Sequence, residues 1–304
     1  MGRHLAMELK AREKQIRILC LFGEKVSPLL ENLGIEIVFG DITQKETLAT
    51  AVAGVATVYH LAAVLISPHR SELFQQVNEI GTHNLVEASI AAGVEHFIYV
   101  SSISVIYSMS NAYSRSKLAG ENRVKHSALK GYTLIRPSLA YADGGAEEFN
   151  RLVSHLRRGP VVMLPGGGRA IKSPIHIDDL TQVFVSILGN ARCLGKTYTL
   201  TGGDDLSLRE MTQLLLTHMG KPKSIISLPI WTCYLAVGFL DILFKFFPGP
   251  NPFTWQTLTG LIQNATSSDK SALKDLNFHP RRFKEGLVTL ISLQGCLKKK
   301  PNRS

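Results

Sequence analysis

The sequence predicts an α/β protein built on a doubly wound parallel sheet, with a smaller mixed α/β region towards the C-terminus. Short apolar runs alternate with helix-forming segments through the first 140 residues. The run 96–100 is rich in aromatic and β-branched residues and stops at two serines, as a buried parallel strand does. After Ala140 the alternation fades, and glycines and prolines interrupt the pattern.

The elements of the first half follow one another in a regular order. Expected strands lie at 16–21, 35–39, 57–60, 96–100 and 132–135, and expected helices at 2–14, 26–32, 45–52, 71–92 and 112–125. A later strand end at 175–179 leads into a helix, and a strand at 198–203 precedes a helix at 206–218. We therefore expect one domain over 1–140 and a second region over 141–304, of which about 172–200 returns to the first domain.

Composition excludes several classes of protein. A hydrophobic content of 45% and a charged content of 19% are typical of a folded globular chain of 304 residues. The net charge is +10, partly from a basic tail at 298–304, but basic residues do not interleave with aromatics, which argues against nucleic-acid binding. This charge fits an anionic cofactor or a membrane surface better. The cysteines are too scattered for a metal site or disulfide, which predicts reduced thiols and a cytoplasmic location: Cys20, Cys193, Cys233 and Cys296.

One apolar segment stands apart from the rest of the C-terminal region. Residues 230–240 are almost all apolar, and Asp241 interrupts the run before 242–247. The uninterrupted run is shorter than the roughly 20 residues that a membrane-spanning helix needs. We expect a buried helix or a wall of an apolar substrate pocket. A helix lying on a membrane surface and a true span are the alternatives.

Three polar residues form the main candidate for chemistry. Tyr113 and Lys117 are four residues apart in an expected helix, and Ser102 lies eleven residues upstream, at the end of a strand. A phenol titrates near 10, and a lysine ammonium one turn away would lower that pKa. A serine hydroxyl at the strand end would bind the same substrate oxygen. The Tyr-x-x-x-Lys spacing arises often by chance, but together the three residues predict proton transfer to or from a carbinol or carbonyl.

Further landmarks follow the other strands. Asp41 and Ile42 end a strand, where the carboxylate suits an adenine amino group or, equally, a turn. Leu61, Ala62 and Ala63 end the next strand with small residues that permit close approach of a nucleotide, and the preceding His60 is expected to be structural. A buried Asn78 in a helix needs partners and would hold a water.

Taken in this order, these residues resemble the extended short-chain dehydrogenase/reductase family, also described as NAD-dependent epimerases/dehydratases, which has a Rossmann-type fold. The resemblance runs from Gly2 to about Leu290, and it is closest to the 3β-hydroxysteroid-dehydrogenase-like branch. That finer assignment rests on residues 101–104 and the apolar stretch 230–240. The resemblance implies an NAD(P)-dependent oxidoreductase that moves a hydride between nicotinamide and a carbinol or carbonyl carbon of an apolar or sterol-like substrate.

The resemblance also assigns roles to single residues. It implies that Tyr113 is the general acid/base, Lys117 its activator and a ribose-hydroxyl donor, Ser102 the orienting hydroxyl and Asn78 the support of a water relay. No metal site is implied. The residues implied to bind NAD or NADP, besides Tyr113 and Lys117, are Gly2, Asp41, Ile42, Leu61, Ala62, Ala63, Pro137 and Ser138.

The sequence departs from the family at its beginning. A first strand and a turn Gly-x-x-Gly-x-x-Gly, which presents N–H groups to the pyrophosphate, are expected before the first helix, and only the final glycine matches, at Gly2. We expect an N-terminally shortened enzyme whose sheet lacks this central strand. The alternatives are a nucleotide-sugar epimerase or dehydratase, and a noncatalytic nucleotide-binding or assembly protein. Segment 21–23 contains neither the acidic residue expected to select NAD nor an arginine for the 2′-phosphate of NADP, so the choice of cofactor stays open. A homodimer is compatible with the sequence.

Overall fold

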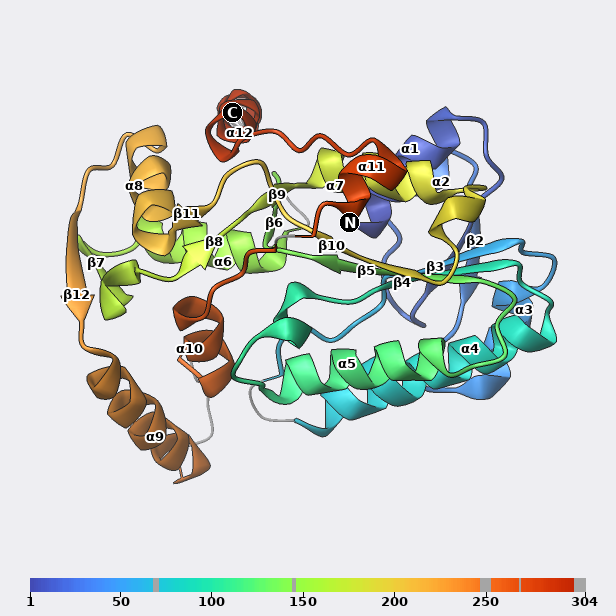
Figure 1. Ribbon diagram of the computed structural model, residues 1–304, viewed down its shortest axis with the longest axis horizontal. Coiled ribbons are helices and arrows are strands. Elements are labelled where there is room, and N and C mark those ends of the chain that lie inside the picture. The colour runs from blue at the N-terminus through green and yellow to red at the C-terminus, as the bar shows by residue number, and fades with distance from the viewer. Residues whose placement is uncertain (68–70, 144–145, 247–252, 268, 298–304) are drawn as a thin grey trace, which may run out of the picture.

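A four-stranded parallel sheet occupies the centre of the molecule. The computed structural model describes residues 1–67, 71–143, 146–246, 253–267 and 269–297. The sheet contains β3 (Thr57–His60), β4 (His96–Val100), β5 (Tyr132–Pro137) and β10 (Lys196–Leu200), in the order β10-β5-β4-β3 (Figure 1). All three pairings are parallel, and β10 returns from the second half of the chain to pair with β5.

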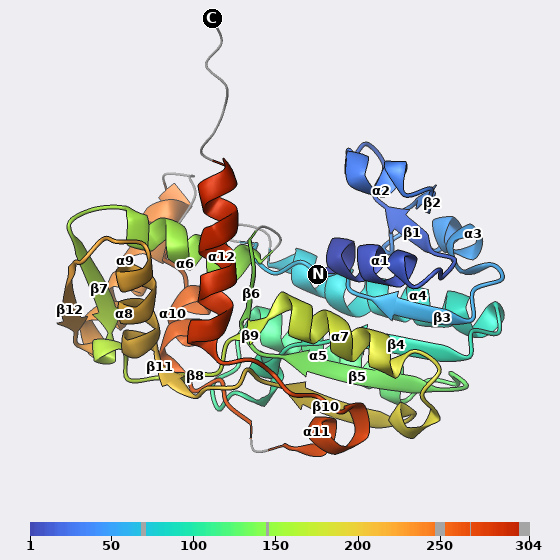
Figure 2. The ribbon, with the colours of Figure 1, turned by 90° about the horizontal axis from the view of Figure 1, so that it is seen from above.

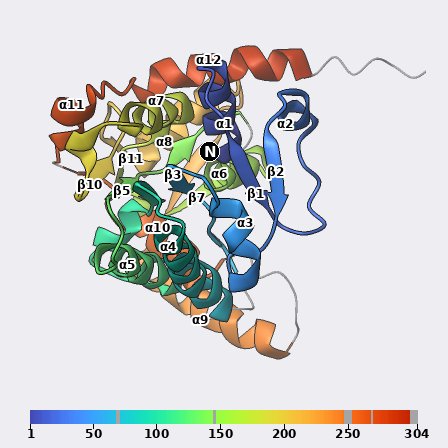
Figure 3. The same cartoon turned by 90° about the vertical axis from the view of Figure 1, so that its right-hand side faces the viewer.

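Helices cover both faces of this sheet, as the alternating pattern predicts. On one face lie α1 (Gly2–Ala11) and α7 (Ile177–Ile187), and on the other α4 (Thr82–Ala91) and α5 (Ala112–Lys125) (Figure 2). Because side chains alternate along a strand, β4 sends Ile98 and Val100 into the core beneath α1 and α7. Phe97 and Tyr99 enter the core beneath α4 and α5, which lie against each other (Figure 3). Every residue of β4 is buried.

The first two strands form a separate pair. β1 (Arg17–Cys20) is hydrogen-bonded to β2 (Glu36–Phe39), and these strands are joined through α2 (Pro28–Asn32). Within the described part of the chain, β1 pairs with β2 alone and β3 pairs with β4 alone, so the β1 and β3 edges are not connected. The described strands of the first half thus lie in two separate parallel sheets, β1-β2 and β10-β5-β4-β3, and the parallel α/β architecture is the predicted one.

The second half of the chain builds a smaller lobe beside the sheet (Figure 1). Two short strands, β6 (Ala140–Tyr141) and β9 (Ile175–His176), pair where the halves meet. The lobe's own strands pair as β12 with β7 and β11 with β8. Its elements are α6 (Glu147–Arg157), β7 (Val161–Pro165), β8 (Ile171–Lys172), β11 (Leu206–Ser207), α8 (Leu208–His218), β12 (Ser224–Leu228), α9 (Ile230–Phe246) and α10 (Trp255–Ile262).

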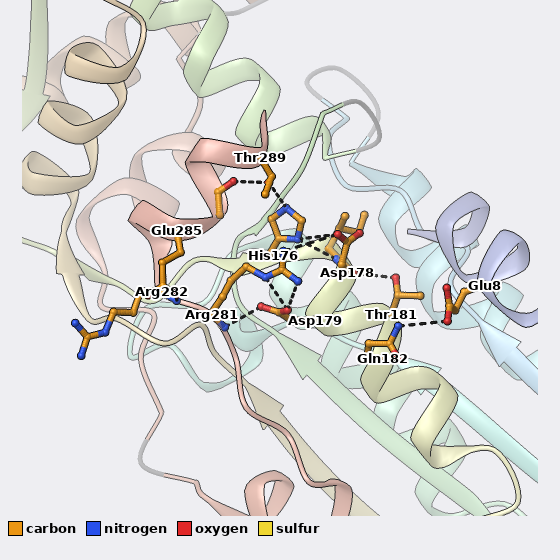
Figure 4. A network of polar contacts seen from close by, with 12 residues as sticks. Glu8, His176, Asp178, Asp179, Thr181, Gln182, Arg281, Arg282, Glu285 and Thr289 are labelled. Carbon is orange, nitrogen blue, oxygen red and sulfur yellow. Dashed lines mark hydrogen bonds and ion pairs between the residues drawn. The ribbon is translucent and has the colours of Figure 1, made fainter. Parts of the chain in front are cut away.

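A polar network fastens the last part of the chain to the core. α11 (Ser271–Leu276) and α12 (Phe283–Leu297) are joined by a segment in which Arg281 meets Asp179 at the start of α7 (Figure 4). The Arg281 backbone N–H donates to Asp179 Oδ2 at 3.0 Å, and its Nε donates to Oδ1 at 2.9 Å. Gln182, one turn further along α7, donates to Glu8 of α1 at 3.3 Å. Asp179 therefore ties the start of α7 to the segment between α11 and α12, and Gln182 ties α7 to α1.

The expectation for the apolar segment 230–247 is wrong in one respect. It is helical as predicted, but α9 is buried on one side only, and large apolar side chains on its other side are exposed. No residue of α9 lines the cavity described below, so α9 is not a pocket wall. Gly144, Gly145, Phe247 and the basic tail 298–304 lie outside the described residues.

Candidate active site

Ser102, Tyr113 and Lys117 line one cavity of about 850 Å³, within the usual size range of small-molecule sites. The cavity opens at the carboxyl ends of β4 and β5, where ligands bind in open parallel sheets. Ser102 lies two residues after the end of β4, and the other two residues come from α5. The structure thus brings together the three residues that sequence spacing had placed in one site.

Local sequence fixes the start of α5 and so the position of Tyr113. Asn111 and Ser114 form a capping box, in which Ser114 N donates to Asn111 Oδ1 at 2.9 Å and Asn111 N donates to Ser114 Oγ at 2.9 Å. Tyr113 and Lys117 then face the sheet with 7% and 1% of their surface exposed. One turn on, a Cβ at Gly120 would lie 2.7 Å from the Asn78 carbonyl oxygen, so glycine allows the close approach of α5.

Lys117 is held from the sheet side. Its Nζ donates to the Val100 carbonyl at 2.7 Å and lies 4.2 Å from the centre of the Tyr99 ring. Burial lowers the pKa of Lys117 to about 7, and the nearby Glu121 carboxylate opposes this shift. Glu121 itself is paired with Arg136 through two hydrogen bonds of 2.7 and 2.6 Å. Lys117 therefore releases its proton more readily than an exposed lysine does.

The pKa of Tyr113 differs from the sequence expectation. Burial raises it above its ordinary value, the Glu148 carboxylate raises it further, and a hydrogen bond with the Ser102 side chain lowers it. Lys117 was expected to lower the phenol pKa, but desolvation dominates in this cavity. Tyr113 is therefore protonated at neutral pH and can act as a proton donor.

Ser102 is oriented by its own turn. The Ser102 Oγ accepts hydrogen bonds from the Ser104 N–H at 3.1 Å and from the Ser104 hydroxyl at 2.9 Å. These contacts cap the short helix Ile103–Ile106 that follows β4. With its acceptor sites used in this way, the hydroxyl has a proton to donate towards Tyr113 or a substrate oxygen.

Asn78 positions the site rather than touching it. It lies completely buried in a π-helical segment, Phe74–Gly81, and does not line the cavity. Its Nδ2 donates to the Val64 carbonyl and the Ser116 hydroxyl, each at 3.0 Å, and its Oδ1 accepts from Val64 N at 2.8 Å. Both amide hydrogens are thus used within the protein, which leaves them unavailable for the water relay that the sequence predicted. Asn78 instead ties the loop after β3 to α5.

The predicted cofactor residues fall into two groups. Leu61, Ala63, Pro137 and Ser138 line the cavity, and so does Met1, the N-cap of the helix that begins at Gly2. Small side chains and a helix N-terminus beside a buried lysine fit a dinucleotide with anionic phosphates. Four predicted residues are not part of the cavity lining: Gly2, which directly follows Met1, Ala62, Asp41 and Ile42.

The structure gives the last two of these residues structural roles. Asp41 Oδ1 accepts from Thr43 N at 2.8 Å, so the carboxylate closes a turn, which was the alternative interpretation of this residue. Ile42 is buried in the core against Gly81. His60 is structural as expected, because its Nε2 lies 2.9 Å from the Thr82 hydroxyl and burial lowers its pKa to about 3.

Sequence reasoning missed one wall of the cavity. α6 and the residue after it present a polar face there, spaced three and four residues apart: Glu148, Arg151, Ser154, His155 and Arg158. The signal was available, because this spacing is that of one helical face. It was overlooked because the segment follows a glycine-rich loop where the regular pattern ends. The wall carries two arginines, so it is predominantly basic.

Together, the fold and the site define a dinucleotide-dependent oxidoreductase of the α/β class. The sequence matches the NAD(P)H-binding family over residues 1–163, more than half of the chain, and the protein belongs to that family. Within it, the protein is a member of the extended short-chain dehydrogenase/reductase group that includes the epimerases and dehydratases, and its cofactor is NAD(P).

Similar proteins cover nearly the whole chain. The 2-alkyl-3-oxoalkanoate reductase of Stenotrophomonas maltophilia is 25% identical over 317 residues, covering 95% of both chains. The 3β-hydroxysteroid dehydrogenase/Δ5→4-isomerase of Mycobacterium tuberculosis is 27% identical and covers 92% of this chain and 83% of its own. The structure of MoeE5 with UDP-glucose and NAD superposes with a TM-score of 0.74 at 19% identity, covering 98% and 96% of the two chains, which supports the fold.

Proposed function

We propose that this protein reduces a carbonyl group, or oxidises the corresponding alcohol, with Tyr113 as the group that exchanges the proton. The observation that carries the proposal is the meeting of Tyr113, Lys117 and Ser102 at one cavity. Bound NAD(P)H would supply the hydride in the reducing direction. The protonated phenol of Tyr113 donates to the substrate oxygen, and the Ser102 hydroxyl holds that oxygen in place.

Lys117 has two tasks in this scheme. A phenolate left after proton transfer is unfavourable in a buried site, and an ammonium group nearby stabilises it. Because burial brings the pKa of Lys117 to about 7, the lysine also gains or loses a proton readily near neutral pH. The Val100 carbonyl, which accepts from Nζ at 2.7 Å, fixes the lysine so that it serves the phenol and the cofactor's ribose from one position.

The cavity favours an oxo or hydroxy acid with an apolar body as the substrate. Leu65, Ala140 and Ala146 supply apolar surface, which suits the apolar substrate that the sequence predicted. The basic face of α6, with Arg151 and Arg158, suits a carboxylate. By its name, the reductase from Stenotrophomonas maltophilia acts on an oxo acid, which supports this substrate class. Residues 230–240, one of the two segments from which the sequence predicted an apolar substrate, form part of α9 and lie outside the cavity.

The first experiment measures net turnover. The protein is mixed with NADH or NADPH and a 2-alkyl-3-oxoalkanoate, and loss of the reduced nicotinamide is followed. Steady oxidation of the cofactor supports the proposal. UDP-glucose is the second substrate tested, because a basic wall would also suit the diphosphate of an epimerase substrate. Conversion of UDP-glucose without net cofactor oxidation, together with no turnover of the oxo acid, would contradict the dehydrogenase assignment.

A second experiment tests the basic wall. Arg151→Gln and Arg158→Gln should each raise KM for the oxo acid by about tenfold, which corresponds to the loss of about 1.4 kcal/mol of binding. KM for the ethyl ester of the same acid should stay unchanged, and Arg192→Gln, an exposed arginine away from the cavity, is the matched control. If these variants weaken binding of the nicotinamide cofactor instead, the wall binds the cofactor's diphosphate and the substrate assignment is wrong.

A further inference from the structure

α9 carries a row of large apolar side chains that the rest of the described structure leaves uncovered. Five residues repeat at intervals of three or four along the helix, and between 59% and 76% of the surface of each is exposed: Trp231, Leu235, Phe239, Ile242 and Phe246. At about 100° per residue, these five positions fall within an arc of about 80° on the helix. We call this set the α9 stripe.

The opposite side of α9 is the one that packs against the protein. Cys233 and Val237 are buried in a small cluster with Leu258 of α10. On the helical wheel these two residues lie about 180° from the centre of the α9 stripe. α9 therefore has two apolar faces, and only one has a partner within the described structure. In Figure 1 the helix extends from the lobe at the lower left, beyond α10.

The composition of the α9 stripe points to lipid rather than to a second copy of the chain. A helical pair with this spacing is normally flanked by charged residues that set its register. Here the nearest flanking positions hold Thr232 and Leu243 on one side and Gly238 and Lys245 on the other, so they offer no pair of opposite charges. Trp and Phe beside Leu are instead the residues that bury into the boundary between headgroups and acyl chains. A second tryptophan, Trp255, is 44% exposed beside α9 and stacks on Tyr234 at 5.6 Å.

Charge identifies the kind of lipid. Apart from the cavity wall and the buried Lys172, the lobe segments 147–172 and 206–262 hold six Lys and Arg residues against three Asp and Glu residues, and the whole chain carries +10. A basic surface is attracted to an anionic leaflet. Within the described residues, no helix combines the length and apolarity needed to cross a membrane. We propose that the α9 stripe docks this protein onto the surface of an anionic membrane, with α9 lying in the interfacial plane.

Intrinsic fluorescence provides a direct test. The chain has only two tryptophans, Trp231 and Trp255, and both lie at the proposed surface. The full chain is titrated with vesicles of phosphatidylcholine alone and with vesicles that contain phosphatidylserine. The tryptophan emission should shift to shorter wavelength and be quenched by lipids brominated on their acyl chains, more strongly with phosphatidylserine. Sedimentation with the vesicles gives the bound fraction independently.

Matched variants separate the α9 stripe from general hydrophobicity. Leu235→Ser with Phe239→Ser should lower vesicle partitioning by about tenfold or more, since each removes a side chain whose burial contributes about 1.5–3 kcal/mol. Leu29→Ser with Val288→Ser changes residues of 55% and 61% exposure elsewhere, and it should leave partitioning unchanged. Both double variants should keep the parent's thermal midpoint. Absence of vesicle binding by the parent overturns the proposal. The proposal is also overturned if the parent forms a dimer without lipid and only the Leu235→Ser, Phe239→Ser variant is monomeric.

Discussion

The four-stranded sheet and the β1-β2 pair differ in how deeply their side chains are buried. In β4 every side chain is buried, whereas in β1 none is fully buried and in β2 the two end residues are exposed. β4 lies between two strands and beneath helices on both faces, while β1 and β2 pair only with each other among the described residues. Lys117 is anchored to β4, and the predicted adenine contacts Asp41 and Ile42 follow β2. The part of the site proposed to perform the chemistry is thus better supported than the part expected to bind the adenine.

The largest expected effect is the loss of turnover when the Tyr113 hydroxyl is removed. Tyr113→Phe removes the proton donor but keeps the ring that packs edge-on against Phe74. Turnover should fall by about 10²–10⁴-fold, the usual contribution of a general acid, while cofactor affinity stays within about twofold. Single-turnover kinetics and fluorescence titration with NADH measure the two quantities. Tyr107→Phe is the control, and retained turnover in Tyr113→Phe would exclude the phenol as the acid.

Core substitutions compare the two sheets directly. Ile98→Ala in β4 should lower the free energy of unfolding by about 2–5 kcal/mol, because it opens a cavity in a fully buried strand. Ile18→Ala in β1 removes the same atoms from a half-covered site, so the loss should be about half as large or less. Urea denaturation gives both values. Equal losses would show that β1 is as well packed in solution as β4.

Two asparagines provide a similar comparison at the loops. The Asn78 side chain makes three hydrogen bonds, two to Val64 in the loop after β3 and one to Ser116 of α5. Among the described residues, the Asn84 side chain makes one, from Nδ2 to the Ile42 carbonyl at 3.0 Å. Asn78→Ala leaves the half-buried N–H and C=O of Val64 without their side-chain partner, and it should cost about 1–3 kcal/mol, against about 1 kcal/mol for Asn84→Ala.

If Asn78 acts by positioning, kcat in Asn78→Ala should fall with an unchanged pH profile. Asn78→Asp, which keeps the acceptor oxygen, should recover part of kcat. A displaced pH optimum would instead indicate that Asn78 takes part in proton transfer.

The last comparison is a pH dependence of stability. Lys117 has a pKa of about 7 in the folded protein and about 10.5 when unfolded, so unfolding takes up a proton between these values. The free energy of unfolding should therefore rise with pH from about 7.5 to about 9.5, by up to about 1.4 kcal/mol per pH unit from this group. In Lys117→Met that contribution should vanish. An unchanged slope would mean that the lysine stays charged in the folded state.

Local pattern was sufficient for most of the first half. β3, β4 and α5 begin and end where the sequence predicted, because an apolar run between polar breakers has few other solutions. The helix predicted over 2–14 ends earlier, at Ala11, and Glu13 takes a positive φ. The helix predicted over 71–92 begins with π-helical turns at Phe74–Gly81. This distortion accompanies the burial of Asn78, which no local pattern specifies.

The remaining differences depend on contacts between distant segments. Asp41 was ambiguous between an adenine contact and a turn, and its hydrogen bond to Thr43 shows a turn. The pKa of Tyr113 was expected to fall through its neighbour Lys117, but burial and Glu148, from a different helix, raise it. Neither burial nor a neighbour contributed by another element can be read from a spacing of four residues.

The sequence by itself determined the order of strands and helices and the residues capable of proton transfer, because periodicity and the i, i+4 relation are local properties of the chain. Only the tertiary structure decided which side chains share a cavity and which surfaces stay uncovered. It placed the basic face of α6 in the same cavity as Tyr113. It also left the α9 stripe exposed, although its apolar sequence predicted a buried helix. Burial stabilises an apolar side chain, but whether the side chain is buried depends on whether another part of the chain packs over it.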